Sequence, residues 1–145
     1  MKIKILTIML LSFLFSGCIY PVYRTIQPVT KVEVLDTRGV AVHGAKVYLS
    51  TKEYYPFKFK VEVVRSNLNG ISEFDSIKKW GTDMLMIHGV KPKNDWSLCV
   101  EKEKYQTQVI RPKNKDDFAY QKVILTDGES TNCLDEPFMG YYKNQ

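Results

Sequence analysis

The chain has 145 residues, a formal charge of +5 and a hydrophobic content of 44%. Setting aside residues 1–17, which hold two lysines, leaves 128 residues with a charge of +3, enough for one domain with one core. A charge this small excludes the strongly basic surface of a typical nucleic-acid-binding domain.

Residues 1–17 have the organisation of a signal peptide. Lys2 and Lys4 form a short positive segment, and residues 5–15 are apolar except for Thr7 and Ser12. A membrane-spanning helix needs about 20 apolar residues, so this run is too short to span, but it matches the apolar region of a secretory signal. We therefore expect the protein to be exported.

The end of this segment carries a more specific pattern. Residues 14–18, Leu-Phe-Ser-Gly-Cys, resemble the lipobox of bacterial lipoproteins, with Phe15 where leucine is usual. The resemblance implies cleavage before Cys18 and attachment of lipid to its sulfur. The alternatives are an ordinary secretory signal with a chance cysteine, or an uncleaved anchor. Ile19 stands where an inner-membrane lipoprotein of a Gram-negative cell carries Asp, which favours anchoring at the periplasmic face of the outer membrane.

Residues 18–28 follow as a candidate tether. They include two prolines and show no helical periodicity, so we expect an extended segment between lipid and domain. Its apolar side chains Tyr20, Val22 and Tyr23 could instead dock part of it onto the domain.

Residues 29–126 alternate between short strands and turns. Residues 57–63 (Phe-Lys-Phe-Lys-Val-Glu-Val) give the clearest strand, because apolar and polar side chains alternate without a break. Turns are expected at 36–39 and 67–70, and residues 75–83 are interpreted as irregular. Further strands are expected at 31–34, 45–49, 71–74, 84–87, 96–100, 105–110 and 118–125. No segment shows a helical pattern, so we predict an all-β sandwich of about seven strands with a polar tail at 127–145.

Residues 32–47 resemble the opening hairpin of carboxypeptidase regulatory-like domains, through Asp36-Thr-Arg-Gly39 and Gly44-Ala-Lys-Val47. Residues 69–74 and 105–109 are similar to the later strands of that family, with Lys104 where glycine is usual and His43 where proline is usual. The resemblance implies a prealbumin-like (transthyretin-like) sandwich. It also implies a structural or interaction module, because most members of the family act in that way.

Cys99 and Cys133 remain after Cys18 is assigned to lipid. The oxidising environment of the envelope permits a disulfide between them. The alternative is two separate thiols, with Cys99 buried in a strand and Cys133 in the tail.

The sequence offers no pattern typical of an enzyme or a metal site. His43 and His88, the only histidines, are too far apart in sequence to form a metal-binding pair motif. The acidic pairs Asp116-Asp117 and Asp135-Glu136 each lack the number of oxygens that calcium requires. There is no nucleophile elbow or phosphate-binding glycine loop, and the carboxyl-terminal Gly140-Tyr-Tyr-Lys-Asn-Gln145 lacks the Tyr-Arg-Gly-Ser ending of the transthyretin-like hydroxyisourate hydrolase. We expect no catalytic residues, no metal and no cofactor.

Two basic loops suggest a docking patch. The segments 91–95 and 111–117 both contain Pro-Lys-Asn, and a meander over residues 84–125 would bring them to one end of a sheet. The cations of this candidate patch for an anionic partner are Lys91, Lys93, Arg111, Lys113 and Lys115. The alternative is a pair of solvated loops whose charge is offset by nearby acidic residues.

These features favour a lipid-anchored, non-enzymatic binding or structural module that contacts an envelope protein and no nucleic acid. The second hypothesis is an immunity lipoprotein or hydrolase inhibitor of the periplasm.

Overall fold

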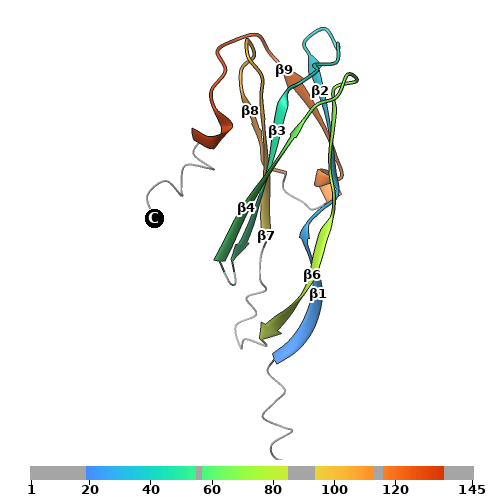
Figure 1. The fold of residues 1–145 in the computed structure, drawn as a ribbon, viewed down its shortest axis with the longest axis vertical. Helices are drawn as coiled ribbons and strands as arrows, with labels where there is room; N and C mark the ends of the chain where they lie inside the picture. Colours follow the sequence, from blue (N-terminus) through green and yellow to red (C-terminus); the bar gives the residue numbers. More distant parts are fainter. Residues whose placement is uncertain (1–18, 55–56, 85–93, 113–115, 136–145) are drawn as a thin grey trace, which may run out of the picture.

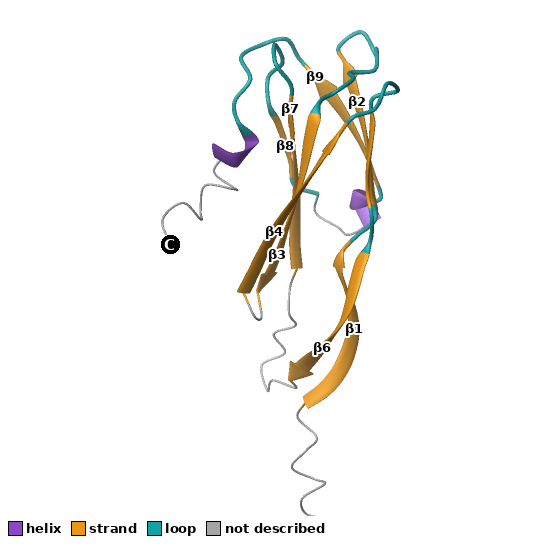
Figure 2. Cartoon of the chain, viewed as in Figure 1, coloured by secondary structure: helices purple, strands orange, loops and turns teal. Residues whose placement is uncertain are grey.

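The computed structural model describes residues 19–54, 57–84, 94–112 and 116–135 (Figure 1). Within these residues there is no α-helix, and two short 3-10 turns accompany the strands (Figure 2). The strands are β1 (Ile19–Gln27), β2 (Thr30–Asp36), β3 (Lys46–Tyr54), β4 (Phe57–Arg65), β5 (Ile71–Phe74), β6 (Ile77–Met84), β7 (Asn94–Glu101), β8 (Gln108–Ile110) and β9 (Tyr120–Leu125). The 3-10 turns are η2 (Asp116–Phe118) and η3 (Cys133–Asp135).

The strands form a sandwich, which confirms the predicted all-β class. One sheet has the order β4–β3–β7–β8 and the other the order β5–β2–β9, with β9 parallel to β2. A two-stranded β1–β6 ribbon prolongs the second sheet, because β1 leads into β2 and β5 leads into β6 (Figure 1).

The core lies between the two sheets and follows from period-two alternation. Successive side chains of a strand point to opposite faces, so every second residue enters the core. Phe74 and Phe118, which are nearly inaccessible, pack among the aliphatic residues. The aliphatic core residues are Val32, Val34, Val42, Ala45, Val47, Leu49, Leu98, Val100, Val123 and Leu125. Burial of each larger side chain contributes about 1.5–3 kcal/mol.

The tether and the irregular segment expected from the sequence are instead paired strands. Residues 19–27 form β1 and residues 77–84 form β6, an antiparallel pair in which Val22 faces Gly81. Local sequence gave no sign of this pairing, because each strand satisfies the hydrogen-bonding groups of a segment fifty or more residues away. Gly81 also makes room for the side chain of Arg24, since a Cβ at Gly81 would lie 2.9 Å from Arg24 Nη2.

Three connections cross between sheets where hairpins or a meander were expected. After the turn at Asp36–Gly39, residues 40–42 pair briefly with the end of β2 through the antiparallel Leu35–Ala41 bridge, and the chain then enters the opposite sheet as β3. The hairpin expected at 32–47 is therefore limited to this bridge, because β3 does not pair with β2. The Asn67–Gly70 turn similarly joins β4 to β5 across the sandwich. β9 pairs with β2, so residues 84–125 do not form a single meander.

The expected strand at 105–110 is shorter than predicted. Lys104 has a positive φ of 71°, and the Gln106 amide donates to the carbonyl of Thr126 at 2.8 Å. The strand is therefore confined to Gln108–Ile110, because residues 104–107 bond with the tail. Of the strand expected at 84–87, residues 85–87 lie outside the described residues.

Two glycines provide a matched test of the turn geometry. Gly39 and Gly70 have similar positive φ angles, 80° and 74°. A Cβ at Gly39 would meet nothing within 4 Å, whereas one at Gly70 would lie 2.5 Å from the carbonyl oxygen of Val34. We expect Gly39→Ala to lower the free energy of unfolding by about 1–2 kcal/mol, the cost of left-handed backbone. Gly70→Ala should lower the free energy of unfolding by about 1–3 kcal/mol more than Gly39→Ala, because the backbone at Val34 must move to admit the new Cβ.

Chemical denaturation of both variants measures this difference. Equal losses of stability would show that Gly70 is required only for its backbone angle.

Candidate functional site

Three charged side chains lie in a row across the β4–β3–β7–β8 sheet. Lys46 begins β3, and its register partners are Arg65 at the end of β4 and Glu101 at the end of β7. Like charges directly opposite each other on neighbouring strands are destabilising, so Arg65 beside Lys46 is unfavourable unless an anion is close. Glu101 supplies that anion for Lys46.

Glu101 is a buried carboxylate held by three donors. Lys46 Nζ lies 2.6 Å and the Tyr48 hydroxyl 2.9 Å from its Oε1, and the Cys133 amide donates to Oε2 at 2.9 Å. Burial alone would raise the pKa of Glu101, but these hydrogen bonds outweigh it and hold the pKa below its ordinary value. The hydrogen bond to Glu101 also raises the pKa of Lys46, so the pair stays ionised around neutral pH.

The tail is fixed next to this carboxylate by a disulfide. Cys99 and Cys133 are bonded and both are inaccessible to solvent, so the disulfide alternative is confirmed. The Thr107 hydroxyl donates to the carbonyl of Thr131 at 2.6 Å and accepts from its amide at 2.9 Å. Residues 126–135 therefore form a wall beside β7 and β8.

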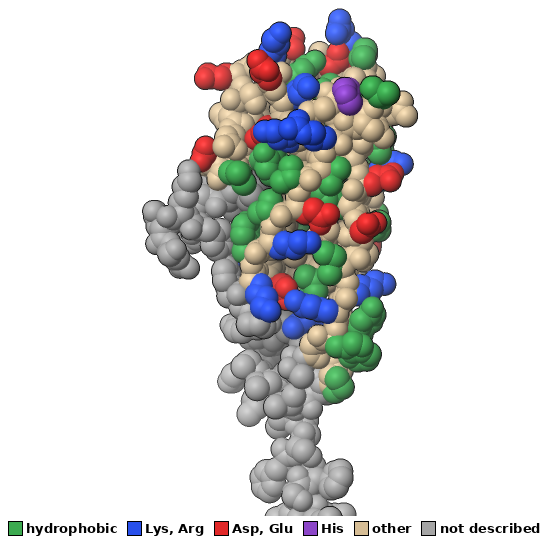
Figure 3. Space-filling model, viewed as in Figure 1, with side chains coloured by type: hydrophobic (Ala, Val, Ile, Leu, Met, Phe, Trp, Pro, Cys, Tyr) green, Lys and Arg blue, Asp and Glu red, His purple; other side chains and the backbone are tan. Residues whose placement is uncertain are grey.

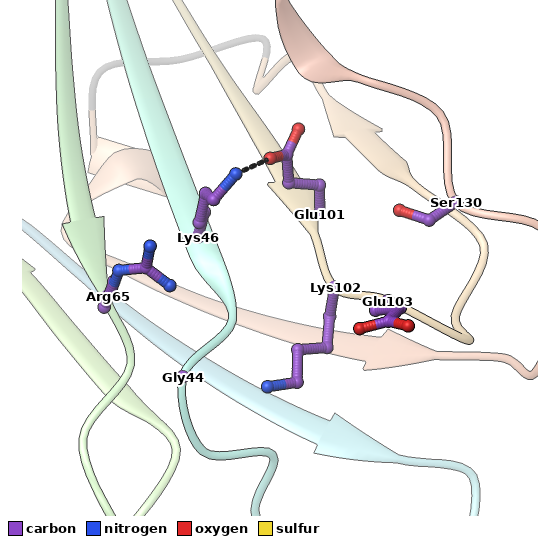
Figure 4. A pocket seen from close by; sticks show the side chains of 7 residues that line it. All are labelled: Gly44, Lys46, Arg65, Glu101, Lys102, Glu103 and Ser130. Carbon is purple, nitrogen blue, oxygen red and sulfur yellow. Dashed lines mark hydrogen bonds and ion pairs between the residues drawn. The ribbon is translucent and has the colours of Figure 1, made fainter.

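A cavity of about 370 Å³ opens between this wall and the charged row. We call it the basic pocket; it is lined by Gly44, Lys46, Arg65, Glu101, Lys102, Glu103 and Ser130. Figure 4 shows Lys46 turned toward Glu101, with Arg65 and Lys102 entering from β4 and from the loop after β7. Among the described residues, the side chains of Arg65 and Lys102 make no hydrogen bond or ion pair.

The lining of the basic pocket holds three cations and two carboxylates, and Lys46 is already paired with Glu101. Arg65 and Lys102 together outnumber the remaining carboxylate, Glu103, so the pocket keeps a small positive excess that suits an anion. Arg65 offers a planar fork of donors suited to a carboxylate or phosphate, and Lys102 adds a second cation. Glu101 is already hydrogen-bonded to three donors, one of them the cationic Lys46. Its negative charge therefore repels an incoming anion less than the charge of an isolated carboxylate would. The Ser130 hydroxyl provides a neutral donor on the opposite wall.

The candidate patch predicted from the sequence is only partly described. Arg111 is exposed after β8, at the same end of the β7–β8 pair as Asn94. The other four members, Lys91, Lys93, Lys113 and Lys115, lie outside the described residues. The patch consequently stays a prediction.

The remaining sequence candidates do not gather into a site. His43 is exposed in a turn, and His88 lies outside the described residues. Asp116 and Asp117 are exposed in η2, Asp135 is exposed in η3, and Glu136 is not described. Over the described ranges, no three His, Cys, Asp or Glu side chains are close enough to hold a metal ion. No helix in those ranges is long and apolar enough to cross a bilayer.

Sequence reasoning missed the basic pocket because its cations are scattered. Lys46, Arg65 and Lys102 come from three segments, each of which also resembles an ordinary strand end. Only the strand register brings them together. The Gly44–Ala45 pair was the one local signal, because it marks a close passage of chains, and Gly44 lines the pocket.

No protein-family model matches the chain, and searches of curated proteins and of solved structures also found no match.

Removal of the disulfide should weaken both the fold and the pocket wall. The bond joins residues 34 apart, and loops of this size are typically stabilised by about 2–4 kcal/mol. We expect Cys99→Ala/Cys133→Ala to lose that much stability in urea denaturation. Amide exchange at residues 126–135 should accelerate before exchange in β3 and β7. Equal acceleration of amide exchange in residues 126–135, β3 and β7 would contradict a local role of the disulfide in holding the tail.

The stability conferred by Glu101 should depend on pH. Because its folded-state pKa lies below the ordinary value of 4.5, its contribution is present above that pH and is lost as pH falls through the folded value. We expect Glu101→Gln to cost about 1–3 kcal/mol at pH 7, the value of hydrogen bonds to a charged group. The gap between variant and wild type should shrink below pH 4.5. A gap independent of pH would show that the carboxylate charge is unimportant.

Proposed function

We propose that this protein is a lipid-anchored lipoprotein of the bacterial envelope that acts as a non-enzymatic binding or structural module. The observation that carries the binding role is the basic pocket, where the charged groups of Arg65 and Lys102 border a cavity and have no described protein partner. We also propose that the sandwich is of the prealbumin-like kind, a view supported by its two layers and the turn at Asp36–Gly39.

The position of the pocket supports this role. Lys46, at one end of β3, borders the pocket, whereas Glu53 near the other end bonds to Lys79 of the β1–β6 ribbon at 2.9 Å. Strands rise about 3.3 Å per residue, so these two ends are separated by more than 20 Å. With lipid on Cys18, immediately before β1, the pocket would lie at the end of the domain that is distant from the lipid.

The partner that suits the pocket is an envelope protein presenting carboxylate side chains. The pocket is open and lined by polar residues, which suits a surface contact better than an enclosed small molecule. We place the anchor at the periplasmic face of the outer membrane on the basis of Ile19.

Processing gives the first test. Intact mass of protein extracted from membranes should correspond to a chain that begins at Cys18 and carries acyl chains. The Cys18→Ser variant should lack the lipid and appear in the soluble periplasmic fraction. A wild-type chain starting at Met1 without lipid would contradict the proposal.

Partner binding gives the second test. We expect Arg65→Glu/Lys102→Glu to reduce recovery of a cross-linked envelope partner at least tenfold, because charge reversal places like charges at the contact. Lys58→Glu/Lys122→Glu, which changes two exposed lysines away from the pocket by the same total charge, is the matched control. Equal recovery with both double variants would contradict a role for the pocket. Capture of a toxin or cell-wall hydrolase would favour the immunity or inhibitor hypothesis.

A further inference from the structure

The outer face of the β1–β6 ribbon carries an exposed aromatic pair. Tyr23 and Trp80 are direct register partners with ring centroids 5.2 Å apart. Their exposed fractions are 57% and 70%, although side chains of this size usually bury most of their area. Figure 3 shows hydrophobic side chains gathered at this lower end of the molecule.

The inner face of the ribbon is more polar than the inner face of the sandwich. In the ribbon this face carries half-buried Arg24 and Lys79, and Lys79 bonds to the buried Glu53 of β3. The rings of Tyr23 and Trp80 therefore point outward together with the exposed Lys78, while Arg24 and Lys79 point inward beside Val22. In the β5–β2–β9 sheet the apolar residues Val32, Val34 and Phe74 point inward instead.

The inner face is fixed in this orientation by bonds to the other sheet. The Trp96 indole donates to the carbonyl of Ile26 at 2.7 Å, and the Asn94 amide donates to the carbonyl of Thr25 at 3.0 Å. Gln27 adds a bond to Glu62 at 2.9 Å. Rotation of the ribbon to bury Tyr23 and Trp80 would break these contacts, so the aromatic pair stays outward.

A lipid surface is the covering that fits this face. Contact with lipid at this face depends on the proposed lipidation, since β1 begins at Ile19, the residue after Cys18. Tyr23 is five residues from Cys18, about 17 Å of extended strand, so a ribbon lying along the bilayer would place its outer face among the headgroups. Tyrosine and tryptophan favour this interfacial region, and the exposed Lys78 suits anionic headgroups.

We propose that the outer face of the β1–β6 ribbon, centred on Tyr23 and Trp80, docks in the headgroup region of an anionic bilayer. The ribbon then lies along the membrane and orients the domain, in addition to the lipid that anchors it.

The test uses the lipidated full-length product in vesicles of phosphatidylethanolamine and phosphatidylglycerol whose lipids are brominated near the glycerol end of the acyl chains. The protein contains two tryptophans, so subtracting the Trp80→Phe spectrum from that of wild type isolates Trp80 and leaves the Trp96 hydrogen bond intact. We expect at least twofold quenching of Trp80 by the brominated lipids and at least twofold protection from acrylamide. Trp80→Phe/Leu68→Trp is the matched control, because Leu68 is 79% exposed in the turn at the pocket end. A tryptophan there should remain open to acrylamide and unquenched by lipid.

The outcomes separate docking from anchoring. Lipidated protein that floats with the vesicles but leaves Trp80 unquenched and open to acrylamide overturns the docking alone. Absence of lipid from the purified protein overturns the proposed anchoring and the docking with it. Protection of Trp80 in native membranes but not in protein-free vesicles would assign this face to a protein partner and overturn lipid docking.

Discussion

The hydrogen bonds of the buried Glu101 carboxylate are the interactions on which the basic pocket depends. The carboxylate joins the first residue of β3, the Tyr48 hydroxyl and the amide of Cys133, so two strands and the tail meet at one buried anion. Without it, Lys46 and Arg65 would face each other as uncompensated like charges, and the tail would lose a charge-assisted bond beside the disulfide. Glu101 therefore acts together with the disulfide and the Thr107–Thr131 hydrogen bonds to hold the wall of the basic pocket.

The sandwich divides into two parts that are held together by different forces. Between the two sheets the contacts are aliphatic and aromatic, which fixes the packing through buried apolar area. Beyond Thr30 and Phe74 the β1–β6 ribbon is held by polar contacts, such as the Lys79–Glu53 pair and the indole of Trp96. Polar contacts exchange readily with water and contribute less net stability, so this part should open more easily than the core. That difference is consistent with partner binding at the basic pocket on the rigid part and with the proposed docking of the adaptable ribbon on a bilayer.

Sequence reasoning was most successful where structure is local. The alternation in 57–63 predicted β4, and the Asp36–Gly39 and Asn67–Gly70 turns lie where expected. The disulfide joins distant residues, but it could be predicted because two cysteines remain once Cys18 is assigned to lipid. Sequence reasoning failed where strand pairing is distant. Residues around Trp80-Gly81 lack the alternation of a half-buried strand, because the aromatic Trp80 faces outward with Lys78 whereas the charged Lys79 faces in. The pocket cations escaped notice for the same reason, since Lys46, Arg65 and Lys102 are neighbours only through the strand register.

Site-specific photo-cross-linking in living cells tests the binding role most directly. A photoreactive phenylalanine analogue in place of Ser130, on the pocket wall, would be compared with the same group in place of Lys122 on β9. The account predicts one dominant cross-linked protein from position 130 that is absent from position 122. Its cross-linked peptide should be rich in Asp and Glu. Cross-links from position 122 but none from position 130 would contradict the claim that the basic pocket is where this protein meets its partner.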